Sequence, residues 1–510
     1  MDNEKQLIGL KKQKLQKIYD LSLDPYPEKS KRNYYINQLF ANKQELLNKN
    51  LNIVISGRLR ALRRQGKIGF GNLQDSSGKI QIYANREIMG LENYEIFKLC
   101  DLGDIVQVSG LMFFTNSGEY TFKIEKISIL CKTIRPLPTV KEKVVGDKIE
   151  RYDIFSDKEL RYRKRYLDLI LNPQNLEIFA KRSKIISCFR DILDKKGFLE
   201  VETPILQPLY GGANAKPFTT RYNKLDQKFF LRIATELYLK RLIIGGYDKV
   251  YEIGKNFRNE GMDKNHNPEF TVIELYQAFS DLDGMIELTQ NLISETALVI
   301  NGTYKTNFSN MEISLEKPFK RETMLNLIEQ FTGEDFSDFN FEKIAAYCKT
   351  NDIEITKDCG PGALIGKIFD AKVEDKLIQP TFVLDYPVEI SPLAKRKSSN
   401  KNLVYRFELF IGGSEFANAF SELNDPIEQK KRMKMQVKKR KLGDEEANEM
   451  DKDFLEALEY GMPPTGGLGI GLDRVVMLLT GKSSIKDVIF FPQMRTLKKQ
   501  NNESKSNKKS

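Results

Sequence analysis

The sequence is poor in histidine, and this shortage excludes several classes of chemistry. His266 is the single histidine in 510 residues. A metal site built from several histidines is therefore impossible, and a Ser-His-Asp or Cys-His arrangement could use only His266. No Gly-x-Ser-x-Gly motif accompanies it. Any catalysis must rest mainly on carboxylates, arginines and metal ions.

Cysteine and long apolar runs are also scarce. The five cysteines are odd in number and form no Cys-x-x-Cys pair, which argues against a disulfide framework or structural zinc and favours a reducing compartment. No stretch approaches about 18 uninterrupted apolar residues, and the basic N-terminus lacks the apolar centre of a signal peptide. These absences predict a cytoplasmic protein with no membrane association.

The composition fits a soluble protein of about three domains. Apolar residues make up 40% and charged residues 30% of the chain. The 81 lysines and arginines exceed the 70 aspartates and glutamates, which gives a net charge of +11. A basic protein suits an anionic partner such as nucleic acid, although many unrelated proteins are equally basic.

A polar hairpin is predicted over Lys249–Phe279. Two alternating segments, KVYEIGKNF and EFTVIELYQAF, flank a loop rich in Gly, Asp, Asn and Pro. Because side chains alternate in a strand, functional groups gather on one face: Phe270, Val272, Glu274 and Tyr276 on one limb, with Arg258 and Glu260 on the other. An ordinary amphipathic hairpin with its charges in water explains the pattern equally well.

The composition and residue pattern divide the rest of the chain into segments. Residues 1–48 predict a basic helical extension that lies on nucleic acid or in solvent, 49–138 a small five-stranded barrel, and 139–158 a linker. A larger domain follows over 159–497, with an inserted group of helices at about 285–395, and 498–510 predict a disordered basic tail. We assign no chemistry to the insertion.

Two further segments complement the hairpin. In YRFELFIGGSEFANAFSELNDP, Asn418, Phe420 and Glu422 share a face, and Glu408 and Glu415 are acidic residues in an otherwise apolar strand. Such residues are costly to bury unless they meet cations. TGGLGIGLDR predicts a glycine-rich turn entering a helix with Arg474 in its first turn, and its spacing does not match Gly-x-Gly-x-x-Gly.

Together these segments resemble class II aminoacyl-tRNA synthetases, and within subclass IIb the lysyl-tRNA synthetases of bacterial type. The resemblance covers about residues 50–495. It rests on GRLRALRRQGKIGF in the barrel, RYLDLILNP to ETPIL as motif 1, FRNEG through HNPEFT to ELY as motif 2, and GLGIGLDR as motif 3. The class I alternative needs a HIGH-type histidine pair, which this chain lacks.

The resemblance implies an α+β fold and a nucleotide site. An N-terminal five-stranded OB-fold β-barrel that binds the anticodon would precede a class II catalytic domain, an antiparallel sheet flanked by helices that forms a homodimer through motif 1. Arg258 and Arg474 would be the catalytic arginines. Arg258 would hold the ATP α-phosphate and the amino-acid carboxylate, and Glu260 would bind the adenine amino group. Phe270 and Arg474 would enclose the adenine.

The resemblance also implies a metal and an amino acid. His266 and Arg474 would lie near the γ-phosphate, and Glu408 and Glu415 would hold Mg²⁺ as cofactor. The family's lysine-binding positions match Gly212, Glu236, Arg258, Glu274, Tyr276, Asn418, Phe420 and Glu422. Because an ammonium substrate requires anionic partners, these carboxylates favour lysine over aspartate.

In the barrel, Phe70 and Gln81 match the family's anticodon-reading positions, with Arg58 and Glu125 nearby. Their expected target is the central uridine of tRNA(Lys). Three alternatives stay open: an aspartyl or asparaginyl relative, a lysine-activating paralogue that modifies a protein, and a non-catalytic RNA-binding protein. The barrel opposes the second of these, and the presence of Arg258, Glu408, Glu415 and Arg474 opposes the third.

Overall fold

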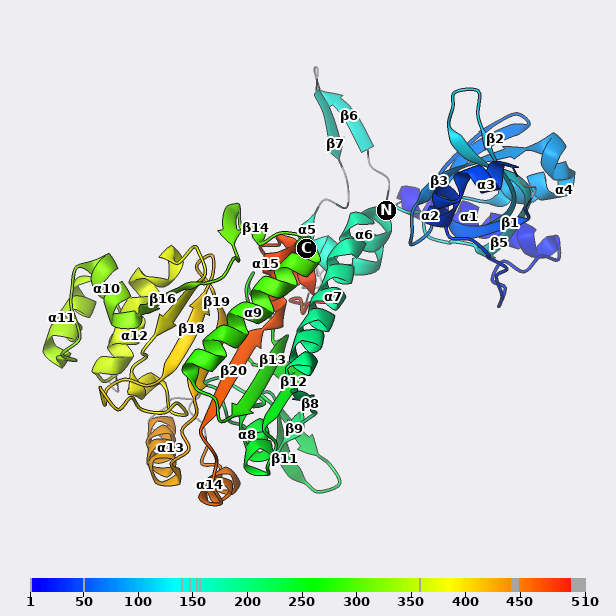
Figure 1. The fold of residues 1–510 in the computed structure, drawn as a ribbon. Helices are drawn as coiled ribbons and strands as arrows, with labels where there is room; N and C mark the ends of the chain where they lie inside the picture. Colours follow the sequence, from blue (N-terminus) through cyan, green and yellow to red (C-terminus); the bar gives the residue numbers. More distant parts are fainter. Residues whose placement is uncertain are drawn as a thin grey trace, which may run out of the picture. The chain divides into compact units, whose positions relative to one another are not determined.

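The computed structural model describes residues 2–48, 51–138, 141–145, 148–152, 155, 157–356, 359–441 and 449–496. The chain divides into two compact units, Met1–Asp157 and Lys158–Ser510 (Figure 1). The predicted tail at 498–510 and parts of the predicted linker at 139–158 lie outside the described residues. In the part of the chain that is described, no helix is long and apolar enough to cross a membrane.

The first unit contains a closed five-stranded barrel with the strand order β1-β2-β3-β5-β4. This confirms the barrel expected from the sequence. Alternate residues of its strands fill the interior, as the two-residue period of a strand requires. The strands are β1 (Ile53–Gln65), β2 (Ile68–Gln74), β3 (Lys79–Asn85), β4 (Ile105–Phe114) and β5 (Tyr120–Cys131). Helix α4 (Arg86–Leu99) connects β3 to β4, and β6 (Lys141–Val145) pairs with β7 (Lys148–Tyr152).

The N-terminal segment packs on this barrel. It forms α1 (Asp2–Asp20), α2 (Ile36–Ala41) and α3 (Lys43–Asn48). Ile18, Ile36 and Leu46 are buried in the same apolar core as the strands. The Lys11 ammonium donates to Thr133 Oγ1 over 2.8 Å. Part of the apolar side of the segment is thus covered by the barrel, which the sequence analysis did not anticipate, whereas Leu7 and Leu10 of α1 are exposed.

The second unit is built on an eight-stranded sheet with the order β16-β17-β18-β19-β20-β13-β12-β8. Its inner pairs are antiparallel, whereas β16–β17 and β12–β8 are parallel. The strands are β8 (Leu199–Glu200), β12 (Lys249–Phe257), β13 (Glu269–Ala278), β16 (Lys320–Thr323), β17 (Thr381–Leu384), β18 (Arg406–Phe410), β19 (Glu415–Ser421) and β20 (Thr465–Gly471). The predicted hairpin at 249–279 is formed by β12 and β13. It lies between the edge strand β8 and β20.

Helices cover one face of this sheet and bury its largest apolar core (Figure 1). They are α7 (Gln174–Lys195), α9 (Leu282–Asn301) and α15 (Leu472–Thr480), with α16 (Ile485–Val488) against α7. The remaining elements are α5 (Lys158–Arg163), α6 (Arg165–Leu171), α8 (Glu236–Ile244), α13 (Pro426–Lys441), α14 (Lys452–Glu459), the strands β9 (Leu206–Gln207), β10 (Thr219–Tyr222) and β11 (Gln227–Leu231), and the hairpin β14 (Lys305–Phe308) and β15 (Met311–Ser314). The opposite face of the sheet is left for the site.

The structure differs from the sequence analysis in two places. The interval 285–395 does contain α10 (Met324–Thr332), α11 (Phe341–Thr350), α12 (Pro361–Lys372) and the short turns η1 (Glu374–Lys376) and η2 (Val388–Ile390), but β16 and β17 within it extend the sheet. The segment TGGLGIG forms the strand β20 rather than a turn, although α15 follows it directly with Arg474 in its first turn.

Candidate active site

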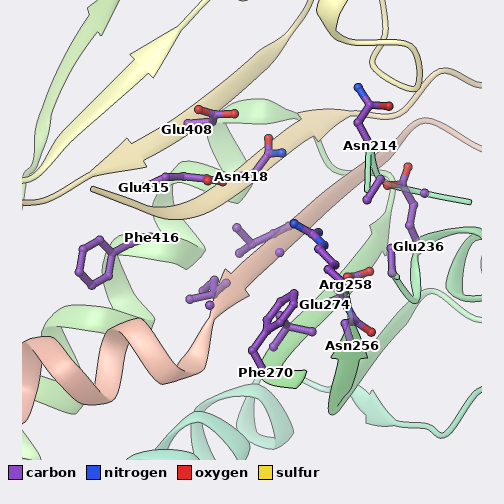
Figure 2. Close-up of a pocket in the computed structure, with 18 of the residues that line it drawn as sticks. Asn214, Glu236, Asn256, Arg258, Phe270, Glu274, Glu408, Glu415, Phe416 and Asn418 are labelled. Atoms are coloured by element: carbon purple, nitrogen blue, oxygen red, sulfur yellow. Dashed lines mark hydrogen bonds between the residues drawn. The ribbon is translucent and has the colours of Figure 1, made fainter. Parts of the chain in front are cut away.

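A cavity of about 470 Å³ opens on the uncovered face of the sheet. It is lined by β12, β13, β18, β19 and β20 together with the loops that carry Gly212, His266 and Ser391. Figure 2 shows carboxylate, amide and guanidinium groups entering it from several of these elements. All but one of the residues predicted for the catalytic domain line it: Gly212, Glu236, Arg258, Glu260, His266, Phe270, Glu274, Tyr276, Glu408, Glu415, Asn418, Phe420 and Arg474. Glu422 is the exception.

Glycines of β20 form part of the cavity floor. A Cβ atom on Gly467 would lie 1.9 Å from Glu422 Oε1 and 2.7 Å from Tyr276 Cε1, so no larger residue fits there. At Gly469 the nearest side-chain atom, Glu274 Cγ, would be 3.7 Å from a new Cβ. The glycines therefore let neighbouring side chains and any ligand approach the backbone, as expected for a strand interior with several glycines.

Arg258 follows β12 and is held at the end of the hairpin. Its backbone NH donates to Pro268 O over 2.8 Å, and its guanidinium carbon lies 5.2 Å from the centre of the Phe270 ring. The Arg258 Nε atom is buried and has no hydrogen-bond partner among the described residues. A buried donor of this kind is normally satisfied, so an anionic ligand in the cavity would complete it.

Glu274 of β13 is fixed by three donors. The hydroxyl and backbone NH of Thr235 donate to Glu274 Oε2 over 2.6 and 3.2 Å, and Asn256 Nδ2 donates to Oε1 over 3.3 Å. Burial raises the pKa of Glu274, while the Thr235 hydrogen bonds oppose that rise. A cation in the cavity would stabilise the ionised form.

Glu408 and Glu415 stand at the other end of the cavity, on β18 and β19 (Figure 2). Glu408 pairs with Arg406, and Tyr386 donates to Glu408 Oε2 over 2.9 Å. Burial, together with the nearby Glu415 carboxylate, raises the pKa of Glu408 to about 7 in spite of Arg406. A cation bound at this end of the cavity would therefore stabilise the ionised carboxylates.

Arg474 connects this acidic end to the hairpin loop. Its Nη1 donates to the Glu415 backbone oxygen and lies 3.6 Å from Glu415 Oε2. Its Nη2 lies 3.5 Å from His266 Nε2, and His266 Nδ1 lies 2.9 Å from Asp263 Oδ2. The structure thus places Arg474 beside His266, the two residues that the sequence analysis assigned to the γ-phosphate, and also beside Glu415, which it had grouped only with Glu408.

Glu422 lies just behind the cavity lining. It follows β19, is 1% exposed, and forms an ion pair with the ammonium of Lys240. The same ammonium lies 2.5 Å from Glu236 Oε1, one helical turn earlier in α8. Glu422 therefore already has a cationic neighbour within the chain, which the sequence analysis did not foresee.

In the barrel, Phe70 and Gln81 lie on the outer surface of adjacent strands. Phe70 pairs in register with Tyr83, their ring centres 5.0 Å apart, and Gln81 accepts a hydrogen bond from Thr121 over 3.0 Å. Arg58 donates to Gly103 O over 2.7 Å, and no contact among the described residues joins it or Glu125 to Phe70. Phe70 and Gln81 lie two residues out of register on paired strands, since Gln81 pairs with Asn72.

Three residues that the sequence analysis passed over lie next to the predicted site residues. Arg406 shares a face with Glu408 two residues later, and Lys240 follows Glu236 at helical spacing; both spacings are readable from the sequence. Arg63 lies directly opposite Phe70 because β1 has an irregularity between Leu59 and Ala61. Such a bulge shifts which residues face outward, and no residue type in β1 marks it.

Comparison with known proteins assigns the chain to a family. The family described as tRNA synthetases class II (D, K and N) matches residues 157–495, and an OB-fold nucleic acid binding domain matches residues 53–130. The chain belongs to the class II aminoacyl-tRNA synthetases of this group. The resemblance drawn from its four segments is confirmed.

Within this group, the chain is similar to curated lysine–tRNA ligases. The chain is 49% identical to the lysine–tRNA ligase of Carboxydothermus hydrogenoformans over 96% of this chain and 98% of the relative. It is 50% identical to that of Pelotomaculum thermopropionicum over 96% and 95%, and 48% identical to that of Oceanobacillus iheyensis over 96% and 98% of the two chains. Each of these relatives carries the same name.

Proposed function

We infer that this chain is a lysine–tRNA ligase. It activates L-lysine with ATP to form lysyl-adenylate and pyrophosphate, and then transfers lysine to the 3′-terminal adenosine of tRNA(Lys). The observation that carries this inference is the identity of 46–50% with lysine–tRNA ligases over 96% of the chain. The carboxylate-rich cavity supports it, because an aspartate substrate would be repelled there.

ATP binds at the end of the cavity formed by the hairpin loop and the start of α15. Arg258, whose Nε lacks a partner among the described residues, holds the α-phosphate and the lysine carboxylate. Phe270 and Arg474 enclose the adenine, and Glu260 accepts from its amino group. His266, beside Arg474, lies near the γ-phosphate. Guanidinium groups suit this task because they pair with phosphate in a planar, two-pronged geometry.

Glu408 and Glu415 are the residues that would hold Mg²⁺. Their oxygens are the hard donors that this ion prefers, and proteins usually supply only one or two carboxylates to it beside the phosphates of the substrate. The described residues contain no group of three or more His, Cys, Asp or Glu arranged for a metal, so the phosphates would complete the shell. When bound, Mg²⁺ neutralises charge on the phosphate oxygens.

Lysine occupies the opposite end of the cavity. Glu236 and the backbone at Gly212 bind its α-ammonium, and Asn418 lies near its carboxylate beside Arg258. The ε-ammonium is bound by Glu274, Tyr276 and Glu422, and its aliphatic chain packs against Phe420. Burial and three nearby carboxylates raise the pKa of Tyr276 well above its usual value, so its hydroxyl stays protonated.

The activation step needs no general base. The lysine carboxylate is already ionised and attacks the α-phosphorus of ATP, so that a new P–O bond forms and pyrophosphate leaves. Arg258 neutralises the charge that develops on the α-phosphate oxygens. The 3′-hydroxyl of the terminal adenosine then attacks the lysyl carbonyl, so that an ester bond forms, the bond to the phosphate breaks, and AMP leaves with the hydroxyl proton taken up by its phosphate. The scarcity of histidine agrees with this route.

The barrel supplies the RNA contact. Phe70 stacks on the central uridine of the anticodon, and Gln81 binds its edge, while Arg58 and Glu125 lie further along the same barrel. The enzyme works in the cytoplasm as a homodimer formed through motif 1. The five free cysteines support a cytoplasmic location. The exposed Tyr166 and Leu199 of the motif 1 segments support a dimer contact there.

Amino-acid-dependent ATP–pyrophosphate exchange tests the proposal. Exchange is measured with lysine, aspartate and asparagine, each with and without Mg²⁺, and is expected only with lysine and Mg²⁺. Exchange with aspartate alone would overturn the specificity, and exchange with none of the three would overturn the assignment as a ligase. Charging of tRNA(Lys) transcripts checks the second step.

A further inference from the structure

A fully buried lysine, Lys240, lies between the two carboxylates that bracket the lysine end of the cavity. Its ammonium is 2.5 Å from Glu236 Oε1 and forms an ion pair with Glu422 Oε2. Its side chain has no exposed surface, and neither it nor Glu422 lines the cavity, whereas Glu236 does. Lys240 therefore contacts the site from behind.

We propose that Lys240 is a positioning residue for lysine recognition: its ammonium keeps Glu236 and Glu422 ionised and aims their second oxygens at the substrate. The inference rests on the proposed function, because it takes lysine as the ligand of these carboxylates. It adds a role for a residue that does not itself reach the cavity.

The orientation of the Glu422 carboxylate is the first observation that supports this role of Lys240. One of its oxygens, Oε2, meets Lys240, while the other, Oε1, lies 1.9 Å from the position of a Cβ on Gly467, which lines the cavity. Both oxygens of Glu422 are buried and lack a hydrogen-bond partner among the described residues, and the Lys240 ammonium lies beside Oε2, so Oε1 is the oxygen that is not in the ion pair. A buried, unpaired carboxylate oxygen is costly, and a substrate ammonium above Gly467 would satisfy it.

The balance of charges at the lysine end of the cavity also supports this role. Three carboxylates, Glu236, Glu274 and Glu422, surround this end of the cavity, and Lys240 is the ammonium paired with two of them. When all three are ionised, one cation leaves two negative charges uncompensated. Lysine brings one ammonium group for each of these two charges, and its own carboxylate is offset by Arg258, whereas norleucine, which lacks the ε-ammonium, would leave one of these carboxylates without a cation.

Without Lys240 this balance fails. Buried carboxylates that lose a cationic partner become neutral rather than remain charged. Burial already raises the pKa of both Glu236 and Glu422, and Lys240 is the strongest influence that opposes the rise. A neutral Glu422 attracts an ammonium weakly, so the protein would lose both affinity for lysine and discrimination against norleucine.

The test uses the full-length Lys240→Met and Lys240→Gln variants in lysine-dependent exchange. We expect the KM for lysine to rise at least tenfold and the lysine-to-norleucine ratio of kcat/KM to fall, while the KM for ATP stays within twofold. Arg241→Gln is the matched control, since Arg241 follows in the same helix but pairs with Asp451 and Asp453 outside the cavity. Its lysine KM should not change.

The possible results distinguish failure of the positioning role of Lys240 from failure of the proposed lysine–tRNA ligase function. Absence of lysine-dependent exchange in the unmodified protein would overturn the proposed function itself. An unchanged lysine KM in either Lys240 variant would overturn only the positioning role. Equal rises in the KM for lysine and ATP, or loss of folding in both variants, would assign Lys240 to the stability of the core and likewise overturn the proposal.

Discussion

The Thr235 hydroxyl donates to Glu274 Oε2 across 2.6 Å, so that the last residue before α8 fixes a carboxylate of β13. Thr235→Val keeps the shape of the side chain and removes the donor. We expect the KM for lysine to rise about two- to tenfold, because one such hydrogen bond contributes about 0.5–1.5 kcal/mol. The KM for ATP should not change.

The same variant has a defined pH response. Burial raises the pKa of Glu274 and the Thr235 hydrogen bonds lower it, so loss of the hydroxyl raises that pKa further. More of Glu274 is then neutral at low pH, and the lysine KM of Thr235→Val should fall towards the wild-type value as the pH rises. A defect that is independent of pH would contradict the proposed role of the Glu274 charge.

A pair of glycine substitutions in β20 tests the floor of the cavity. In Gly467→Ala the new methyl group would lie 1.9 Å from Glu422 Oε1, so the carboxylate must move. We expect lysine-dependent exchange to fall at least tenfold through the KM for lysine. Gly469→Ala is the comparison variant: it also adds a methyl group to the floor, but at an ordinary 3.7 Å from Glu274 Cγ, so no carboxylate has to move and the KM for lysine should rise less. Similar lysine KM values in the two variants would contradict this account.

Local patterns made part of this site predictable. The hairpin β12–β13 follows from alternation and turn residues, and Arg474 follows from its place after the glycine-rich segment. Pairings that are distant in the sequence were not readable. The contact of Lys240 with Glu422 joins residues 182 positions apart, the difference of their numbers, and no local pattern encodes it.

Strand assignment failed where the usual propensities were absent. Gly466, Gly467 and Gly469 made β20 look like a turn, because glycine is disfavoured in strands, yet a ligand-facing floor requires residues without side chains. The four-residue strands β16 and β17 are too short to show a period, and their parallel pairing depends on a crossover of the chain.

The barrel surface gives a prediction that is independent of the catalytic cavity. Phe70→Ala removes a ring that is 38% exposed and lies 5.0 Å from the ring of Tyr83. Stacking of a base on an aromatic side chain contributes about 1–3 kcal/mol, so the KM for tRNA(Lys) should rise about five- to 150-fold. Exchange without tRNA should be unchanged.

Arg63→Ala should act in the same direction, because Arg63 lies opposite Phe70 in the register of β1 and β2. Leu91→Ala, in α4, removes an exposed apolar side chain and serves as the control for a general change in the barrel. If Leu91→Ala raised the KM for tRNA(Lys) as much as Phe70→Ala, the anticodon site would have to be placed elsewhere.

Asp168, in the motif 1 region, is fully buried between two arginines. Its Oδ1 lies 2.7 Å from Arg161 Nε and its Oδ2 lies 2.8 Å from Arg165 Nη1. Because Arg165 is only 2% exposed, Asp168→Ala leaves a buried guanidinium unpaired. We expect a loss of about 3–5 kcal/mol, measured as a lower unfolding temperature at neutral pH. Glu312→Ala, which breaks the exposed pair with Lys305, should cost less than about 1 kcal/mol.

The pH dependence of that loss identifies its origin. Burial alone would raise the pKa of Asp168, but hydrogen bonds from Asn172 and Arg161 and the arginine charges hold it below its usual value. A folded pKa below the unfolded value of about 3.9 means that the stabilisation is fully present above that pH and is lost as the pH falls through the folded pKa. The difference in unfolding temperature between the wild type and Asp168→Ala should therefore be constant near neutrality and narrow in acid. A difference that stays the same at all pH values would show that Asp168 stabilises the fold by packing and not by its charge.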